Sequence, residues 1–329
     1  MTRFIVRRLL LLPIALLAIN FVAFSYALLA QRVQQAQNPF GSGVDAAVPI
    51  LSLYRVYLGH VLTGDWGQMP LVGGSAEPVQ TVVAAAAGAS LTLAGVAFLL
   101  SLAVGLLLGL AAVRANPPGL RPWLPPLASL GLASPSFFIG AVGIALVLAL
   151  YLRAGENARL LLPLNGYGLD LHLLLPVLAL SIRPTMQIAQ TTAGVLVDEL
   201  GKQHVVTARS LGIPLRTIRS KHALRNVLPA VILVAAAALR LLVGELILVE
   251  WLFGWPGLGK LLASTLLPPT VASAGGLTGA ARTFLHPELV AALLTLFGLV
   301  FLLADLASSL AVYAVDPRLR MSLEAGDHG

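Results

Sequence analysis

Six long apolar runs, each nearly free of charge, constrain the fold of this chain more than any other feature. Their approximate bounds are Leu9–Ala30, Val83–Val113, Leu124–Leu150, Leu173–Val197, Val227–Phe253 and Leu289–Val315. A helix needs about 20 apolar residues to cross a bilayer, and each run reaches that length. Backbone in lipid must satisfy its own hydrogen bonds, so each run is predicted to be helical. The sequence therefore predicts an all-α integral membrane protein with six transmembrane helices.

The composition agrees with a membrane protein and argues against a soluble nucleic-acid binder. Hydrophobic residues make up 58% of the chain and charged residues only 11%, whereas soluble domains have about 45–50% and about 25%. The net charge of +7 comes almost entirely from arginines. These arginines lie mostly between the apolar runs, which is typical of membrane topology and not of a basic face that binds nucleic acid. With no cysteine in the chain, disulfides, thiolate metal sites and cysteine nucleophiles are excluded.

The first run has a basic start and is open to two interpretations. A secretory signal peptide would have an apolar core of about 7–15 residues, and the run from Leu9 to Ala30 is longer. We therefore expect a retained first helix, and cleavage after Ala30 is the alternative.

The lysines and arginines predict the orientation. With both termini in the cytosol, the cytosolic segments hold 13 lysines and arginines and the external segments hold 6. The positive-inside rule favours this arrangement. It divides the chain into a first helix with an external segment (residues 1–82), a five-helix core (83–320) with a cytosolic loop (about 198–226), and a short cytosolic tail (321–329).

Two external segments are too long to be simple turns. The first extends from Gln31 to Gln80 and contains LSLYRVYLGHVLTGDWG, which predicts a short amphipathic helix on the outer surface. The second extends from Trp255 to Pro287 and is rich in Gly, Ala, Thr and Pro.

No pattern in the sequence predicts covalent chemistry. GWPGLGKL nearly matches the phosphate-binding loop, but Leu261 replaces the hydroxyl residue that would bind magnesium. We expect a tight external turn there. The six histidines are scattered, and no G-x-S-x-G elbow occurs. The chain is therefore not expected to be an enzyme or to hold a cofactor.

Five charged residues fall in or near the predicted spans: Arg183, Arg240, Glu245, Glu250 and Asp305. A charge near the bilayer centre costs about 2.5–3.5 kcal/mol on insertion scales, so it is usually paired or faces a wet cavity. Two interpretations stay open for Arg240 and Glu245: they face a translocation path, or they form an internal pair, such as Arg240 with Glu245 or Asp305. We expect Glu250 at the outer interface.

Two local patterns within the spans point to packing. Gly105 and Gly109 form a small-x-x-x-small pattern that lets two helices approach closely. Pro135 in SPSFF removes a backbone donor, so we expect an ordinary kink in the third span or its start.

The loop at 198–226 is the most distinctive segment. Val197–His204 is expected to continue the fourth helix into the cytosol, followed by a helical stretch HVVTARSL, by Gly212, and by a second helical stretch LRTIRSKHALRN. Gly212 can adopt a positive φ and end the first short helix. Apolar and basic residues alternate in the second stretch, which predicts an amphipathic helix across the end of the bundle. Such a shape fits a groove in another protein.

TARSLG followed by HALRNVLPAV resembles the coupling loop of ABC transporter permeases, in particular the first permease of dipeptide and oligopeptide importers, which include nickel and glutathione systems. Further segments resemble the same family in the same order: TRFIVRRLL, LTGDWG, SPSFFIG, VEWLFGWPGLGKLL and the closing DPR. The chain departs from the family at the loop, where Val206 replaces a glutamate, and at Glu245, where relatives carry a small or apolar residue.

The resemblance implies a type I importer in the inner membrane of a prokaryote, in which this chain forms half of the pore for peptides or similar solutes. The implied partners are a second homologous permease, two ATPases that bind ATP and magnesium, an external solute-binding protein and membrane lipid. It implies a docking surface for the ATPase formed by Thr207, Ala208, Arg209, Leu211, Gly212, Ile213, Leu215, Arg216, Ile218 and Arg219. Nickel and glutathione are alternative solutes. The alternative functions are a self-sufficient secondary transporter or channel, and a membrane scaffold.

Overall fold

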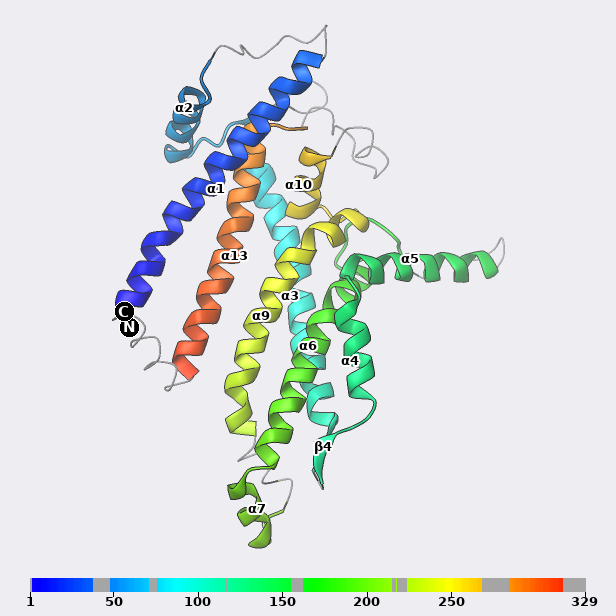
Figure 1. Cartoon of the computed structure of the whole chain (residues 1–329). Coiled ribbons are helices and arrows are strands. Elements are labelled where there is room, and N and C mark those ends of the chain that lie inside the picture. Colours follow the sequence, from blue (N-terminus) through cyan, green and yellow to red (C-terminus); the bar gives the residue numbers. More distant parts are fainter. Residues whose placement is uncertain are drawn as a thin grey trace. The chain divides into compact units, whose positions relative to one another are not determined.

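A computed structural model describes residues 2–37, 48–70, 76–115, 117–154, 162–214, 217, 224–267 and 284–315 (Figure 1). Helices dominate these residues. They are α1 (Thr2–Gln37), α2 (Ile50–Leu62), α3 (Val79–Ala111), α4 (Leu124–Ala133), α5 (Ser136–Arg153), α6 (Leu174–Leu200), α7 (Gln203–Ser210), α9 (Leu224–Leu252), α10 (Leu258–Leu266) and α13 (Pro287–Val315). A 3₁₀ turn, η1 (Leu171–Leu173), precedes α6. Two antiparallel hairpins were not predicted: β1 (Gln68–Pro70) with β2 (Ala76–Pro78), and β3 (Val113–Ala115) with β4 (Pro118–Leu120).

Six helices in the described part of the chain are long and apolar enough to cross a membrane. The spanning segments are Leu10–Gln34, Val79–Ala111, Ser136–Arg153, Leu171–Leu200, Val227–Leu252 and Pro287–Leu310. The prediction of six transmembrane helices is confirmed. The orientation of the termini stays a prediction.

The third predicted span is not one helix. The sequence predicted continuous helix from Leu124 to Leu150, but α4 ends at Ala133 and α5 begins at Ser136. Ser134 is extended, with φ −89° and ψ 117°, because a residue before proline avoids the α region. In Figure 1, α5 leaves the direction of α4 at this break. Of the two outcomes expected for Pro135, a kink or the start of the third span, the structure has the second, because the spanning helix begins at Ser136.

The chain forms two compact units. Unit 1 comprises Met1–Thr92, Pro163–His172 and Leu246–Leu302, and unit 2 comprises Leu93–Leu162, Leu173–Glu245 and Leu303–Gly329. These units describe packing, whereas the division at residues 82 and 83 described topology and stays a prediction.

Unit 1 contains the predicted short helix of the first external segment. This helix, α2, packs its buried Tyr54 and Tyr57 against α1, where the Phe24 ring stacks on Tyr57 with centroids 4.8 Å apart. Asn20 of α1 donates to Thr295 of α13 at 2.9 Å. A second cluster joins the start of α3 to α10 and α13.

Unit 2 is centred on α6, and its packing confirms the glycine pattern. A Cβ added at Gly105 would lie 2.8 Å from Ile188 Cβ, and one added at Gly109 would lie 2.8 Å from Thr192 Cβ. Only glycine lets α3 and α6 approach so closely. Because both contacts advance in the same direction along the two helices, α3 and α6 run parallel at this interface.

Candidate functional site

The loop between the fourth and fifth spans begins one turn earlier than the sequence predicted. Helix α6 ends at Leu200, and a turn at Gly201 and Lys202 separates it from α7. The prediction that Val197–His204 continues the fourth helix was therefore wrong for its last four residues. Within α7, Val205 is fully buried and packs into the core cluster of unit 2, so this short helix is anchored to the end of α6.

The turn is fixed by Glu199, a residue that the sequence did not single out. Its carboxylate is nearly completely buried and bonds Lys202 Nζ at 2.5 Å, with His204 Nε2 at 3.3 Å. Burial of a carboxylate is tolerated when cations and donors surround it. The signal in the sequence was the spacing of an acid three residues before a lysine at the end of a helix.

Gly212 has the predicted left-handed conformation, with φ +77°. It follows the end of α7, where the Leu211 amide bonds to the carbonyl of Thr207 and the Ile213 amide to that of Ala208. A Cβ at Gly212 would meet no atom of the chain within 4 Å. The glycine is therefore required by its backbone angle and not by crowding within this chain.

The proposed docking residues divide into an inward and an outward set. Ala208 and Ile213 pack against the core cluster of unit 2, so they support the loop from within. Thr207, Leu211 and Gly212 are exposed, and the Leu211 side chain is 74% exposed. Val206, also exposed, was not predicted as a docking residue. Leu215, Arg216, Ile218 and Arg219 and the side chain of Arg209 lie outside the described residues.

The charged residues within the spans form two ion pairs in unit 2. Arg240 donates to Asp305 at 2.6 Å, so of the two partners considered for Arg240 the structure selects Asp305. Glu245 pairs instead with Arg183 of α6, a combination that the sequence analysis did not consider.

Glu250, the third acid, is fully buried in unit 1. It lies two residues before the end of the spanning segment Val227–Leu252, and its expected position at the outer interface stays a prediction. Its Oε1 accepts from Ser90 Oγ at 2.6 Å, and its Oε2 accepts from the Gly259 amide at 2.6 Å and from the Lys260 amide at 3.3 Å. These amides belong to the first turn of α10, where backbone donors and the helix dipole favour a negative charge.

This arrangement explains the resemblance of GWPGLGKL to a phosphate-binding loop. The predicted tight turn is present at residues 253–257. The first-turn amides that would hold a phosphate are occupied by Glu250, and the Leu258 amide donates to Ser90 Oγ at 2.7 Å. The motif therefore binds a carboxylate of its own chain.

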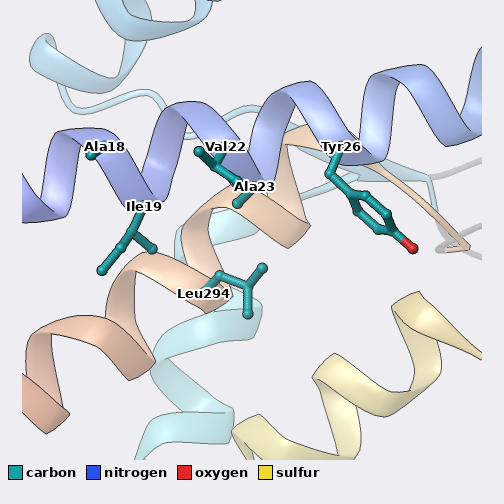
Figure 2. Close-up of a pocket in the computed structure, with 6 residues that line it drawn as sticks. All are labelled: Ala18, Ile19, Val22, Ala23, Tyr26 and Leu294. Atoms are coloured by element: carbon teal, nitrogen blue, oxygen red, sulfur yellow. The ribbon is translucent and has the colours of Figure 1, made fainter.

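The described residues of unit 1 line two cavities of about 460 Å³ each that bear on function. The cavity in Figure 2 lies between α1 and α13 and is lined by Ala18, Ile19, Val22, Ala23, Tyr26 and Leu294. Apart from the Tyr26 hydroxyl, these side chains are apolar and lie within spanning segments, so the cavity suits hydrocarbon.

The second cavity lies where α1, α2 and the start of α13 meet. Two histidines and two acids line it: His60, Asp65, His286 and Glu288. Burial lowers the pKa of His286, which favours the neutral imidazole. Among the described residues, no group of three His, Asp or Glu side chains is placed to bind a metal ion.

Comparison with known proteins identifies the family to which this sequence is similar. The profile of the family described as "Binding-protein-dependent transport system inner membrane component" matches residues 101–321, well over half of the chain. This chain belongs to that family. The matched region contains α6, the loop with α7 and Gly212, and α9.

Individual relatives are similar over most of their length. The dipeptide transport system permease protein DppB of Lactococcus lactis subsp. cremoris is 27% identical over 274 residues, covering 83% of this chain and 82% of the relative. The oligopeptide transport system permease protein OppB of Mycobacterium bovis is 28% identical over an alignment of 352 residues, covering 98% and 100%. A putative peptide permease protein of Brucella suis biovar 1 is 28% identical over 284 residues, covering 85% and 82%.

As a member of this family, the chain is a multi-pass inner membrane protein and the permease component of a binding-protein-dependent transport system. Its role is therefore to provide a path through the membrane.

Proposed function

We propose that this chain forms half of the translocation pore of an ATP-driven importer for dipeptides or oligopeptides. A second homologous permease forms the other half, and a solute-binding protein delivers the solute from outside. Two ATPase subunits bind ATP and magnesium, so this chain itself holds no cofactor. The bias of lysines and arginines supports an orientation in which both termini and the loop at 198–226 face the cytosol.

The exposed end of α7 is the part of this chain that we propose contacts the ATPase. Leu211 is an exposed apolar side chain beside a glycine at φ +77°, and the helix that holds both is anchored by the buried Val205. An exposed apolar residue on a rigid, anchored turn is suited to fill a groove in a partner protein. Movement of an ATPase that holds this turn would be transmitted to α6 through the contacts of Val205 and Glu199.

The choice of solute rests on relatives whose names specify dipeptide and oligopeptide transport. Nickel and glutathione are the alternative solutes, because importers of the resembled family carry these as well. Uptake assays with a short peptide, glutathione and nickel in parallel distinguish the three.

Co-purification and uptake test the proposal together. The tagged chain is solubilised gently from its native membrane, and the proteins that accompany it are identified for the wild type, Gly212→Val and Gly212→Asn. Valine at φ +77° costs about 1–3 kcal/mol in backbone strain, whereas asparagine tolerates this conformation. We expect an ATPase and a second permease with the wild type, loss of the ATPase in Gly212→Val, and retention in Gly212→Asn.

ATP-driven peptide uptake should follow the same order in the three proteins. Unchanged uptake in Gly212→Val would remove the loop from the mechanism. If the wild type purifies alone under several detergents and still transports, a self-sufficient secondary transporter replaces the importer.

A further inference from the structure

A polar face runs along the middle of α6, although this helix lies in a spanning segment. Arg183, Gln187, Gln190 and Gly194 are spaced four, three and four residues apart, which places them on one side of the helix. Arg183, Gln187 and Gly194 are partly exposed, and Gln190 is exposed. We call Arg183, Gln187 and Gln190 the polar face.

The opposite side of α6 is packed tightly within unit 2. Thr185 and Thr192 are buried there, and they lie against α3 where Gly105 and Gly109 allow close approach. The polar face is therefore a side of α6 that the described residues leave partly uncovered. Neither glutamine side chain hydrogen-bonds another described residue.

Glu245 of α9 completes the polar face. Arg183 NH1 donates to Glu245 Oε1, while the Arg183 side chain stays 34% exposed and the Glu245 side chain is 14% exposed. Glu245 Oε2 is buried and bonds no described residue. An arginine has five N–H donors, so the partly exposed Arg183 keeps donors for a further partner, and the partly exposed Glu245 side chain places a negative charge beside them.

Lipid does not suit such a face. Unsatisfied amide and charged groups in hydrocarbon cost several kcal/mol each, and intramembrane ionisable residues usually face a water-filled path. The depth-matched surface of α3 is different, because Leu107 is exposed there, close to Gly105 and Gly109. Leucine suits lipid, so the two exposed surfaces of unit 2 differ in chemistry at one depth.

We propose that the polar face, completed by Glu245, contacts the solute during transport and binds a short zwitterionic peptide. This inference rests on the proposed function and specifies which residues act on the solute. The Arg183 guanidinium donates to the peptide carboxylate, the negative charge of the partly exposed Glu245 side chain attracts the ammonium group, and the two glutamines hydrogen-bond peptide amides.

The dimensions agree with a short peptide. Arg183 and Gln190 are seven residues apart in a helix, which corresponds to about 10 Å along the axis. Three extended peptide residues also span about 10 Å. The face has no net charge when Glu245 is included, which matches a solute that carries one charge of each sign.

The first test measures the access of water to the polar face. The chain contains no cysteine, so a cysteine introduced at one position is the single thiol of this chain. Gln190→Cys, Leu107→Cys and Thr192→Cys are each assembled with the partner subunits in membrane vesicles and treated with a charged, membrane-impermeant maleimide. A thiol reacts as the hydrated thiolate, so we expect Gln190→Cys to react on the order of tenfold faster than either control. Saturating peptide should slow the reaction. No labelling of Gln190→Cys, or equal labelling of Leu107→Cys, would overturn the proposal.

Uptake is the second test. Gln187→Leu with Gln190→Leu should reduce peptide uptake about threefold to tenfold per lost hydrogen bond, while Thr192→Val, on the packed side, should leave it unchanged. Arg183→Gln with Glu245→Gln should reduce uptake of a tripeptide with free ends more than uptake of the same peptide with acetylated and amidated ends. Normal uptake by both double variants would overturn the inference while the importer function stands.

Failure of the proposed function gives a different result. If the wild-type assembly imports no peptide with ATP, the peptide as solute is wrong. Labelling of Gln190→Cys but not of Leu107→Cys would then still support a water-filled path along the polar face. If Gln190→Cys is not labelled, the water-filled path is also wrong.

Discussion

The carboxylate of Glu250 is expected to hold the turn between α9 and α10 in place. Its two oxygens accept from Ser90 Oγ and from the amides of Gly259 and Lys260, and the side chain is fully buried. A Cβ at Gly259 would lie 2.9 Å from Glu250 Oε2, so the carboxylate fits closely against the backbone. Removing it should therefore destabilise unit 1.

The size of the effect follows from the donors left behind. In Glu250→Ala, the amides of Gly259 and Lys260 lose their acceptor, and each unsatisfied buried donor costs about 1–3 kcal/mol. Removing a buried carboxylate returns part of its desolvation cost. We expect a net loss of about 2–4 kcal/mol. In Glu250→Gln the amide oxygen can accept from Gly259 while the amide nitrogen donates to Ser90 Oγ, so the loss should be about 1 kcal/mol.

The assay is thermal unfolding of the purified assembly in detergent. A stability order of wild type, then Glu250→Gln, then Glu250→Ala is expected, with the larger step between the two variants. Ser90→Ala serves as a second probe of the same network, because Ser90 Oγ also accepts from the Leu258 amide at 2.7 Å. An alanine variant as stable as the wild type would refute the argument that this carboxylate is structural.

Three further perturbations follow from the packing and charges. Gly109→Ala would place a Cβ 2.9 Å from a backbone oxygen of α6, so the apparent melting temperature should fall by the equivalent of about 1–3 kcal/mol. The control is Gly95→Ala in the same helix, where a Cβ meets nothing within 4 Å. This control should be neutral or stabilising. Burial lowers the pKa of His286 from its usual 6.5, so the unfolded chain binds a proton before the folded chain does as the pH falls. The free energy of unfolding should therefore be highest above about pH 6.5 and should decrease as the pH falls toward the folded pKa. In His286→Phe this decrease should be smaller. Asp305→Leu should lower the amount of folded protein more than Arg240→Leu with Asp305→Leu, because the single change leaves the cation without its carboxylate; equal yields would argue against the pair.

The spans could be predicted because their signal is local. Each run of about 20 apolar residues specifies a helix in lipid without reference to the rest of the chain. The same holds for the φ of Gly212 and for a close helix approach at Gly105, since glycine at these positions has a direct steric meaning; that α6 is the helix approached was not predicted. The sequence left two outcomes open at Pro135, a kink or the start of the third span, because a proline is compatible with both, and packing decides between them.

The partners of the charged residues could not be predicted, because they are set by contacts between distant segments. Arg183 and Glu245 are 62 residues apart, and nothing in the sequence favours this pair over Arg240 with Glu245. The hairpin of β3 and β4 and the anchoring of α7 by Glu199 were missed for a similar reason. Their short segments carry weak periodicity, and their stability comes from the surrounding core.

The two glutamates of α9 show how the structure separates roles that the sequence leaves equal. Glu245 and Glu250 are five residues apart in one apolar helix, and the sequence alone specifies the partner of neither. Glu250 is fully buried, and both of its oxygens accept from groups of its own chain, so it has no acceptor to offer a solute. Glu245 keeps one oxygen that bonds no described residue, next to an arginine that is one-third exposed. Substituting Glu250 should therefore change stability first, and substituting Glu245 together with Arg183 should change which peptides are transported.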